Sequence, residues 1–325
     1  MAMLRQEIAL TLRQRARPRI TVVRPGGLGD TLLVMPTLQL LLEELPGAEI
    51  TLVGSVWAER LQPLTGLPVR LLRFDSALLT PLFSPSAATD PTGAFADAHA
   101  VVVYAAECEE ILTSNARRFC AGPVIAWPAE PSGAEHASLH FAKAVTHPPL
   151  KPEELPFPSL RVPPDSDEWS GRWLAQRFPE RQAVLALHPG SGGRHKCWPA
   201  ERFARLAELT GRPILLLEGP ADSEACAQVA RLLPPEAPVA RVAGQSVPEV
   251  AALVARCRSY VGNDSGLSHL AAALGVPAVL VFGPTDPKVW APLGPNVQVV
   301  QGGMRGGHSW PSPEQVAKAV QASSA

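Results

Sequence analysis

Long hydrophobic runs, paired cysteines and a strong net charge are all missing from this sequence of 325 residues. The longest strongly apolar stretch, residues 270–282, is interrupted by Gly275 and Pro277 and is shorter than the ~20 residues of a membrane-spanning helix. The five cysteines include no CxxC spacing, which argues against a disulfide framework or a zinc site and favours a reducing compartment. Because the net charge is only −1, no overall positive field is available to hold nucleic acid.

The amino-acid composition is typical of a globular protein. Hydrophobic residues make up 46% and charged residues 18% of the chain, which excludes a disordered protein. At ~150 residues per domain, the length indicates two domains. Charged residues interrupt the N-terminal segment MAMLRQEIALTLRQRARPRI, so it lacks the continuous apolar core of a signal peptide. We expect a soluble, cytoplasmic protein.

Short β-branched runs alternate with longer helical stretches along most of the chain. The predicted strands are residues 20–24, 49–53, 69–72, 100–104, 124–127, 183–188, 213–218, 239–242, 259–262, 278–282 and 297–300. Apolar strands separated by helices are typical of parallel sheets covered on both faces. The proline-rich residues 146–167 predict a linker. We therefore expect an α/β protein with two doubly wound domains, residues 1–160 and 161–325. Ligands bind at the carboxyl ends of the strands in such domains, so the loops after strands are the candidates for chemistry.

The first candidate loop, residues 24–31, reads RPGGLGDT and opens a helix. Gly26 and Gly27 allow a sharp turn and the close approach of a ligand to the backbone. The dinucleotide fingerprint GxGxxG fails, because Leu32 occupies the position of its third glycine. The carboxylate of Asp30 would repel a pyrophosphate, so the loop suits a neutral ligand with hydroxyl groups. Alternatively, Asp30 only caps the helix.

The second loop, residues 188–199, reads HPGSGGRHKCWP and precedes a helix that we expect to begin near Pro199. Arg194, His195 and Lys196 give this loop the positive charge to wrap an anion, and lysine is a compact donor for phosphate oxygens. The alternative is a solvated surface loop without a specific role.

The third loop, residues 262–270, reads GNDSGLSHL and leads into a helix predicted over residues 267–274. A helix N-terminus offers unpaired N–H groups and partial positive charge, which together accept a pyrophosphate. We expect Asp264 to cap the helix, Ser265 to donate to a phosphate oxygen, and His269 to reinforce the anion site or to bind Asp264. The alternative is an ordinary capped core helix.

Two further sets of polar residues are weaker candidates. Asp222 and Glu224 follow a predicted strand, where a carboxylate often binds ribose hydroxyls; solvated acids at a helix start are the alternative. His136, His140 and Lys143 fall on one helical face, which predicts either a surface stripe or side chains that face a ligand.

Three segments together resemble the bacterial lipopolysaccharide heptosyltransferases, glycosyltransferase family 9. They are VVRPGGLGDTLLVMPTLQLL, LHPGSGGRHKCWPAERFARLA and GNDSGLSHLAAALGVPAVLVFGPTDPKVWAPLG, in the order and spacing of the family. The resemblance implies a GT-B architecture of two Rossmann-like domains facing a central cleft, with the acceptor on the N-terminal and the nucleotide-sugar on the C-terminal domain. It also implies that a sugar, such as heptose from ADP-heptose, is transferred with inversion to a glycan or lipid-linked acceptor, without a metal or other cofactor.

The resemblance also implies roles for individual residues. Asp30 matches the family's proposed general base, and Lys196 matches a lysine that contacts the donor phosphates, so these two are the expected catalytic residues. The expected donor-binding residues are Lys196, Asp222, Asp264, Ser265, Gly266 and His269. The expected acceptor-binding residues are Gly26, Gly27 and His140. Family members often carry hydroxyl residues in place of the two glycines, so a lipid A-linked inner core, another lipopolysaccharide sugar and an unrelated glycan all stay open as acceptors.

Other classes of protein also fit parts of this pattern. A nucleotide-sugar epimerase shares the architecture but needs no acceptor. A non-catalytic protein that binds a sugar nucleotide would need no base, and Asp30 argues against it. The failed glycine fingerprint argues against a dinucleotide-dependent oxidoreductase.

Positive charge is concentrated at the start of the chain. Residues 1–24 contain six arginines and one acidic residue, Glu7, whereas residues 25–160 contain seven basic and fifteen acidic residues. This distribution predicts peripheral association with the anionic inner face of the plasma membrane. An ordinary solvated helix that leads into the first strand is the alternative.

Overall fold

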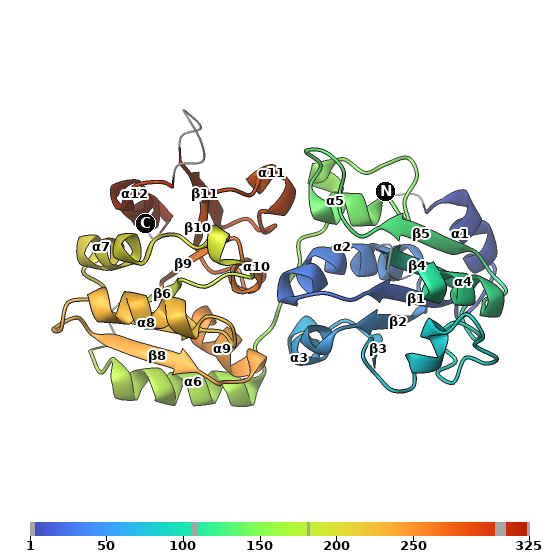
Figure 1. The fold of residues 1–325 in the computed structure, drawn as a ribbon, viewed down its shortest axis with the longest axis horizontal. Helices are drawn as coiled ribbons and strands as arrows, with labels where there is room; N and C mark the ends of the chain where they lie inside the picture. Colours follow the sequence, from blue (N-terminus) through green and yellow to red (C-terminus); the bar gives the residue numbers. More distant parts are fainter. Residues whose placement is uncertain (1–3, 106–109, 181–182, 303–309, 324–325) are drawn as a thin grey trace. The chain divides into compact units, whose positions relative to one another are not determined.

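The computed structural model describes residues 4–105, 110–180, 183–302 and 310–323. The chain divides into two compact units, which are described one at a time (Figure 1). The first unit consists of Met1–Gln62 and Gly66–Pro158, and the second of Pro63–Thr65 and Ser159–Ala325. The division falls inside the predicted linker, two residues before the predicted domain boundary.

The first unit is built on a parallel sheet of five strands in the order β3-β2-β1-β4-β5. The strands are β1 (Arg19–Arg24), β2 (Glu49–Gly54), β3 (Val69–Arg73), β4 (Ala100–Ala105) and β5 (Val124–Pro128). The helices are α1 (Gln6–Leu12), α2 (Leu28–Glu44), α3 (Val56–Thr65), α4 (Glu110–Phe119) and α5 (Ala137–Ala142).

The second unit is built on a parallel sheet of six strands in the order β11-β10-β9-β6-β7-β8. The strands are β6 (Leu185–His188), β7 (Ile214–Glu218), β8 (Val239–Ala243), β9 (Ser259–Asn263), β10 (Ala278–Phe282) and β11 (Val297–Gln301). The helices are α6 (Pro164–Arg177), α7 (Ala200–Thr210), α8 (Ser223–Leu232), α9 (Val247–Ala255), α10 (Gly266–Ala273), α11 (Pro287–Trp290) and α12 (Pro313–Ser323). Every predicted strand is present in one of the two sheets, and both sheets have the strand order of a Rossmann-like fold.

Alternate residues of the strands explain how the sheet of the second unit is covered on both faces. Leu185 and Leu187 of β6 pack into one core with residues of α7, α8 and α12. Ala186, between them, packs into another core with residues of α6, α9 and α10. Because successive side chains of a strand point to opposite faces, a continuous apolar run is needed when both faces are buried.

The order of the strands defines where each unit offers a site. In the first unit β2 and β3 lie on one side of β1, and β4 and β5 lie on the other side. In the second unit β7 and β8 lie on one side of β6, and β9 to β11 lie on the other side. The loops on either side of such a switch point diverge and leave room for a ligand at the carboxyl ends of the strands. The first candidate loop follows β1, and the second and third follow β6 and β9.

The N-terminal segment packs into the first unit. Leu4, Ile8 and Leu12 are buried, and the Arg5 side chain lies over the ring of Trp127 at 4.8 Å. The segment therefore forms a surface helix ahead of β1, as the alternative interpretation expects, and one face of α1 contributes to the core. Leu10, on the other face, is 64% exposed.

Two predicted boundaries differ from the structure. Pro164, placed in the linker, is the first residue of α6, because proline has the right φ for the first helical turn and needs no hydrogen-bond acceptor there. Helix α10 begins at Gly266 and ends before Gly275, which has a φ of +75° that glycine adopts without strain. Within the described residues, no helix has the length and apolar character needed to cross a membrane.

Candidate functional site

The loops after β6 and β9 meet at the switch point of the second unit. The Ser191 hydroxyl donates to the backbone oxygen of Asp264 at 2.6 Å. Lys196 Nζ, from a short 3₁₀ turn (Arg194–Lys196), lies 3.0 Å from Asp264 Oδ2. The structure therefore brings together Lys196 and the predicted anion loop. An ammonium group has three N–H donors, so pairing with one carboxylate leaves capacity for an anionic ligand.

The other basic residues of the β6 loop do not join this pair. Arg194 forms an ion pair with Glu224 of α8 at the surface, and its side chain is 89% exposed. His195 is also exposed. The structure therefore does not bring Arg194 to the β9 loop with Lys196, and the wrapping of one anion by all three basic residues stays a prediction. Lys196 alone of the three pairs with the β9 loop in the part of the chain that is described.

Ser265, and not Asp264, caps α10. Its side chain accepts the backbone N–H of Ser268, as a serine N-cap does. The prediction of Asp264 as the cap is wrong because its carboxylate is turned toward Lys196. The N–H groups of Gly266 and Leu267 belong to the first turn and so have no acceptor within the helix. His269 lies one turn further on and is 7% exposed.

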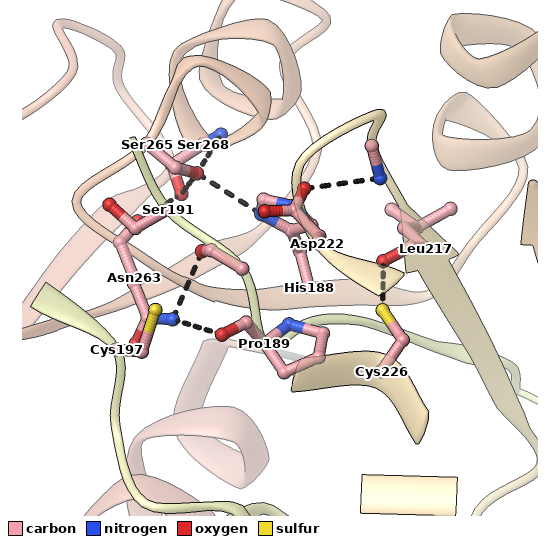
Figure 2. A network of polar contacts seen from close by, with 12 residues as sticks. His188, Pro189, Ser191, Cys197, Leu217, Asp222, Cys226, Asn263, Ser265 and Ser268 are labelled. Carbon is pink, nitrogen blue, oxygen red and sulfur yellow. Dashed lines mark hydrogen bonds and ion pairs between the residues drawn. The ribbon is translucent and has the colours of Figure 1, made fainter. Parts of the chain in front are cut away.

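A buried histidine that the sequence interpretation passed over connects Ser265 to Asp222 (Figure 2). His188, the last residue of β6, is 3% exposed. Its Nε2 lies 2.9 Å from Asp222 Oδ2, and its Nδ1 lies 3.1 Å from Ser265 Oγ. The ring thus joins the loops after three strands, β6, β7 and β9. The available signal was a histidine at the end of an otherwise apolar strand.

Asp222 is nearly buried and is held ionised. Burial by itself favours the neutral acid, but the hydrogen bond and charge of His188 and the backbone N–H groups of Gly219 and Ser191 outweigh it, and the pKa of Asp222 is lowered from its ordinary value. The Gly219 N–H donates to Oδ2 at 3.1 Å. Asp222 also flanks α8 without capping it through its side chain. Its predicted contact with ribose stays a prediction.

A chain of hydroxyl groups continues from Ser265 into the core. Ser265 Oγ lies 3.2 Å from Ser268 Oγ, which donates to the backbone oxygen of Asn263 at 2.5 Å. The Tyr260 hydroxyl lies 3.1 Å from Ser268 Oγ. Ser268 and Tyr260 are completely buried, so each hydroxyl needs these partners.

The side chain of Asn263 links the β6 and β9 loops directly. Its Nδ2 donates to the backbone oxygens of Pro189 at 2.9 Å and Gly190 at 3.1 Å (Figure 2). Its Oδ1 accepts the backbone N–H of Trp198 at 2.9 Å. Asn263 is completely buried. The amide therefore satisfies three backbone groups of the β6 loop and fixes that loop against β9.

The loop after β1 in the first unit holds the carboxylate of Asp30 at the start of α2. Arg24 Nη2 donates to Oδ1 at 2.6 Å, and the Gly27 N–H donates to Oδ2 at 2.7 Å. Asp30 therefore does cap the helix, and it remains one-third exposed. Gly26 has a φ of +138°, and a Cβ there would lie 2.6 Å from Asp30 Oδ2, so glycine is required for this loop conformation.

His140 has a buried, structural environment. Its side chain is 7% exposed, Nε2 lies 2.9 Å from the backbone oxygen of Pro128, and Nδ1 lies 3.8 Å from Glu135. Lys143 also pairs with Glu135, and His136 caps α5. The predicted surface stripe is therefore wrong for His140, because the ring packs into the first unit. Contact of His140 with an acceptor stays a prediction.

Among the described residues, no group of three or more His, Cys, Asp or Glu side chains gathers in a way that could hold a metal ion. Four free cysteines are described, and Cys108 lies outside the described residues.

Comparison with known proteins places the chain in a family. Residues 158–319 match "Glycosyltransferase family 9 (heptosyltransferase)". The chain belongs to this family. The lipooligosaccharide heptosyltransferase 2 of Haemophilus ducreyi is 33% identical over 170 residues, 47% of this chain and 49% of that protein. The lipopolysaccharide heptosyltransferase 2 of Escherichia coli is 30% identical over 159 residues, 46% of this chain and 44% of that protein. This chain therefore spans about half the length of the curated relatives that it matches.

Solved structures extend the likeness to the whole fold. The E. coli ADP-heptose lipopolysaccharide heptosyltransferase II covers 94% of this chain and 98% of its own, with a TM-score of 0.76 and 19% identity. A family 9 glycosyltransferase from Veillonella parvula covers 94% and 97%, with a TM-score of 0.74 and 19% identity. The prediction of a two-domain α/β fold of the glycosyltransferase family 9 type is confirmed.

Proposed function

We propose that this member of glycosyltransferase family 9 transfers heptose from ADP-heptose to a lipopolysaccharide core-type acceptor. The family match and the names of the H. ducreyi and E. coli relatives support this activity. The observation that carries the proposal is the meeting of Lys196, Ser265 and the α10 N-terminus at the switch point of the second unit. A doubly wound domain binds phosphate-containing ligands at this kind of point.

On the donor side, the proposed site stabilises the leaving nucleoside diphosphate. Negative charge develops on the diphosphate as its bond to the sugar breaks. Lys196 supplies a positive charge, and the N–H groups of Gly266 and Leu267 supply hydrogen bonds at the positive end of the helix dipole. We propose that these groups provide the stabilisation that a metal ion would otherwise provide, so that the transfer is independent of metal.

On the acceptor side, Asp30 is the proposed general base. It takes the proton of the acceptor hydroxyl as the oxygen attacks the anomeric carbon, and attack opposite to the leaving diphosphate inverts the configuration. Arg24 and the Gly27 N–H each hold one carboxylate oxygen, which fixes the orientation of the base. Each oxygen has a further lone pair for the incoming proton.

A two-stage experiment tests the proposal. Thermal unfolding is first measured with nucleoside diphosphates and their sugars, since a ligand at ~100 times its Kd adds roughly 2.7 kcal/mol of stability. The stabilising sugar nucleotide is then incubated with a lipopolysaccharide core acceptor, with and without EDTA. Formation of the elongated acceptor in both arms is expected. Consumption of the donor without an acceptor would instead indicate an epimerase or a hydrolase.

We further propose that the enzyme works at the inner face of the cytoplasmic membrane, where a lipid-linked acceptor would be presented. Arg13 and Arg17 at the end of the N-terminal segment have side chains that are 50% and 80% exposed. Glu44 and Glu49 pair with them and neutralise part of their charge. Exposed arginines near an anionic surface each contribute ~1 kcal/mol.

A further inference from the structure

His188 joins two groups of the proposed donor site without being one of the groups expected to touch the donor. Its ring lies between the Asp222 carboxylate and the Ser265 hydroxyl. We propose that His188 is a positioning residue that takes up one proton from solvent when a nucleoside diphosphate binds at α10, and that this proton releases the Ser265 hydroxyl to donate to a phosphate oxygen. This inference rests on the proposed donor site.

Asp222 determines which nitrogen of the His188 ring always carries a proton. An ionised carboxylate only accepts hydrogen bonds, and the lowered pKa of Asp222 keeps it ionised near neutral pH. Nε2, 2.9 Å from Asp222 Oδ2, therefore carries a proton in every state of the ring. Only Nδ1, which faces Ser265, is able to gain or lose one.

The hydroxyl chain determines where the Ser265 proton goes. Ser268 donates its single hydroxyl proton to the backbone oxygen of Asn263. Ser268 Oγ is thus an acceptor toward Ser265, at 3.2 Å. The one proton of Ser265 has two internal acceptors: Ser268 Oγ, and His188 Nδ1 at 3.1 Å when that nitrogen is unprotonated. An imidazole nitrogen is the stronger acceptor of the two.

The two protonation states of His188 therefore present two different surfaces to a ligand. When Nδ1 carries no proton, it accepts a hydrogen bond from the Ser265 hydroxyl. Ser265 then presents only lone pairs to the ligand, and these repel a phosphate oxygen. When Nδ1 is protonated, it donates to Ser265 Oγ, and the serine proton turns to the phosphate. The positive charge of the imidazolium ring also attracts an anion bound at Ser265. An anionic ligand consequently favours the doubly protonated ring.

Other titratable groups lie on the surrounding loops and helices. They are Asp222, Cys197, Cys226, Tyr260, Lys196, Asp264 and His269. Burial raises the pKa of Cys226 to about 12 and also raises the pKa of Cys197 and Tyr260. These three groups therefore stay protonated near neutral pH. Lys196 and Asp264 form an ion pair at 3.0 Å. His269 is the one histidine of α10, and the experiment separates it from His188.

Calorimetric titration with ADP-glucose measures how many protons the protein takes up when the ligand binds. Each phosphate of this probe carries one ester and one anhydride bond and has no second ionisable proton, so its charge is constant between pH 6 and 8. A terminal phosphate, in contrast, titrates at about pH 6. Titrations in buffers of different ionisation heat are expected to show uptake of up to one proton per ligand. By linkage, Kd then rises with pH, by up to about tenfold per unit.

The assignment to His188 uses three variants with the same substitution. H188Q keeps a polar group next to Asp222 but cannot titrate, so proton uptake should vanish. H195Q replaces an exposed histidine of the β6 loop, and H269Q replaces the histidine of α10. In each, the number of protons taken up per bound ligand should persist, whatever the change in affinity. If H188Q does not fold, ¹⁵N NMR of the wild-type imidazole rings with and without ADP-glucose provides the same assignment.

Three results would overturn the inference. They are binding without proton uptake by the wild-type protein, persistent uptake in H188Q, and loss of uptake in H269Q or H195Q with retention in H188Q. Each of these leaves the proposed transferase function standing. Absence of binding by ADP-glucose and by every other nucleoside diphosphate sugar would instead remove the proposed donor site, and the inference with it.

Discussion

Lys196 Nζ and Asp264 Oδ2 lie 3.0 Å apart and join the loops after β6 and β9. Lys196 balances the carboxylate at a place where the proposed ligand is also negative. We expect Lys196→Ala to weaken nucleoside diphosphate binding by about 1.5–3 kcal/mol, the range for hydrogen bonds to charged groups. Asp264 would then repel the ligand, so Lys196→Ala combined with Asp264→Asn should recover part of the affinity.

Calorimetry of ADP binding measures both effects. Lys143, which pairs with Glu135 in the first unit, is the matched control. Lys143→Ala also breaks a lysine–carboxylate pair and should leave ADP affinity unchanged. Equal affinity of wild type and Lys196→Ala would remove Lys196 from the donor site.

Asp30→Asn separates the proposed base from the helix cap. The amide oxygen still accepts the Gly27 N–H, but the side chain no longer takes up a proton. Turnover should fall by roughly 10²–10⁴ with nearly unchanged donor affinity. Initial rates of transfer and donor Kd are the measurements, with thermal unfolding to check the fold. Near-normal turnover would leave Asp30 with the role of helix cap alone.

Gly190→Ala tests how closely the β6 loop approaches Asp222. A Cβ at Gly190 would lie 2.0 Å from Asp222 Cγ, so the backbone or the carboxylate has to move. We expect a loss of about 1–3 kcal/mol in the free energy of unfolding. Gly192→Ala is the matched control, because nothing lies within 4 Å of a Cβ there. Urea unfolding compares the stability of the two variants. Equal stability would mean that the β6 loop adjusts to the added Cβ without a loss of folding free energy.

Acid stability tests the His188–Asp222 contact. The pKa of Asp222 is lowered from 3.8 on folding, so the unfolded chain binds this proton more readily than the folded one. Asp222 therefore stabilises the fold above its unfolded-state pKa, and this contribution disappears as the pH falls through the lower, folded-state pKa. Asp222→Asn should cost about 1.5–3 kcal/mol at neutral pH. Urea unfolding across the acid range should show the two proteins converging; a difference that does not depend on pH would contradict this account.

Membrane association is best tested by substitutions that remove charge, and not by deletion of the N-terminal segment. Deleting residues 1–17 would remove Leu4, Ile8 and Leu12 from the core. Replacing Arg13, Arg15 and Arg17 by glutamine leaves the core intact and should weaken binding to anionic vesicles by up to ~3 kcal/mol at low salt.

Co-sedimentation at low and high salt measures this binding. The matched control changes Arg172 and Arg177 of α6 to glutamine and should have little effect. Unchanged vesicle binding of the triple variant would exclude this segment as a membrane contact.

The sequence predicts the architecture well because burial on both faces imposes a continuous apolar pattern on each strand. It also locates the loops that follow β1, β6 and β9, since glycine and a helix start mark each of them. It does not assign partners within those loops. Asp264 and Ser265 are adjacent, both are good capping residues, and only the position of Lys196, far away in the chain, decides which of them caps α10.

Buried polar residues were the hardest to predict. His188 ends an apolar strand, and its role depends on Asp222 and Ser265, which reach it from two other strands. His140 has helical spacing to His136 and Lys143, but its environment is set by Pro128 of a neighbouring strand. Periodicity within one helix gives no information on what a different strand places against it.

The Asn263 amide has a consequence for engineering this protein. It binds the backbone of Pro189, Gly190 and Trp198, so the β6 loop takes its conformation from a residue of β9. A β6 loop transplanted from another enzyme would keep its shape only if its backbone still met this amide. The two loops form one exchangeable cassette, and chimaeras designed to accept a different sugar nucleotide should therefore replace them together.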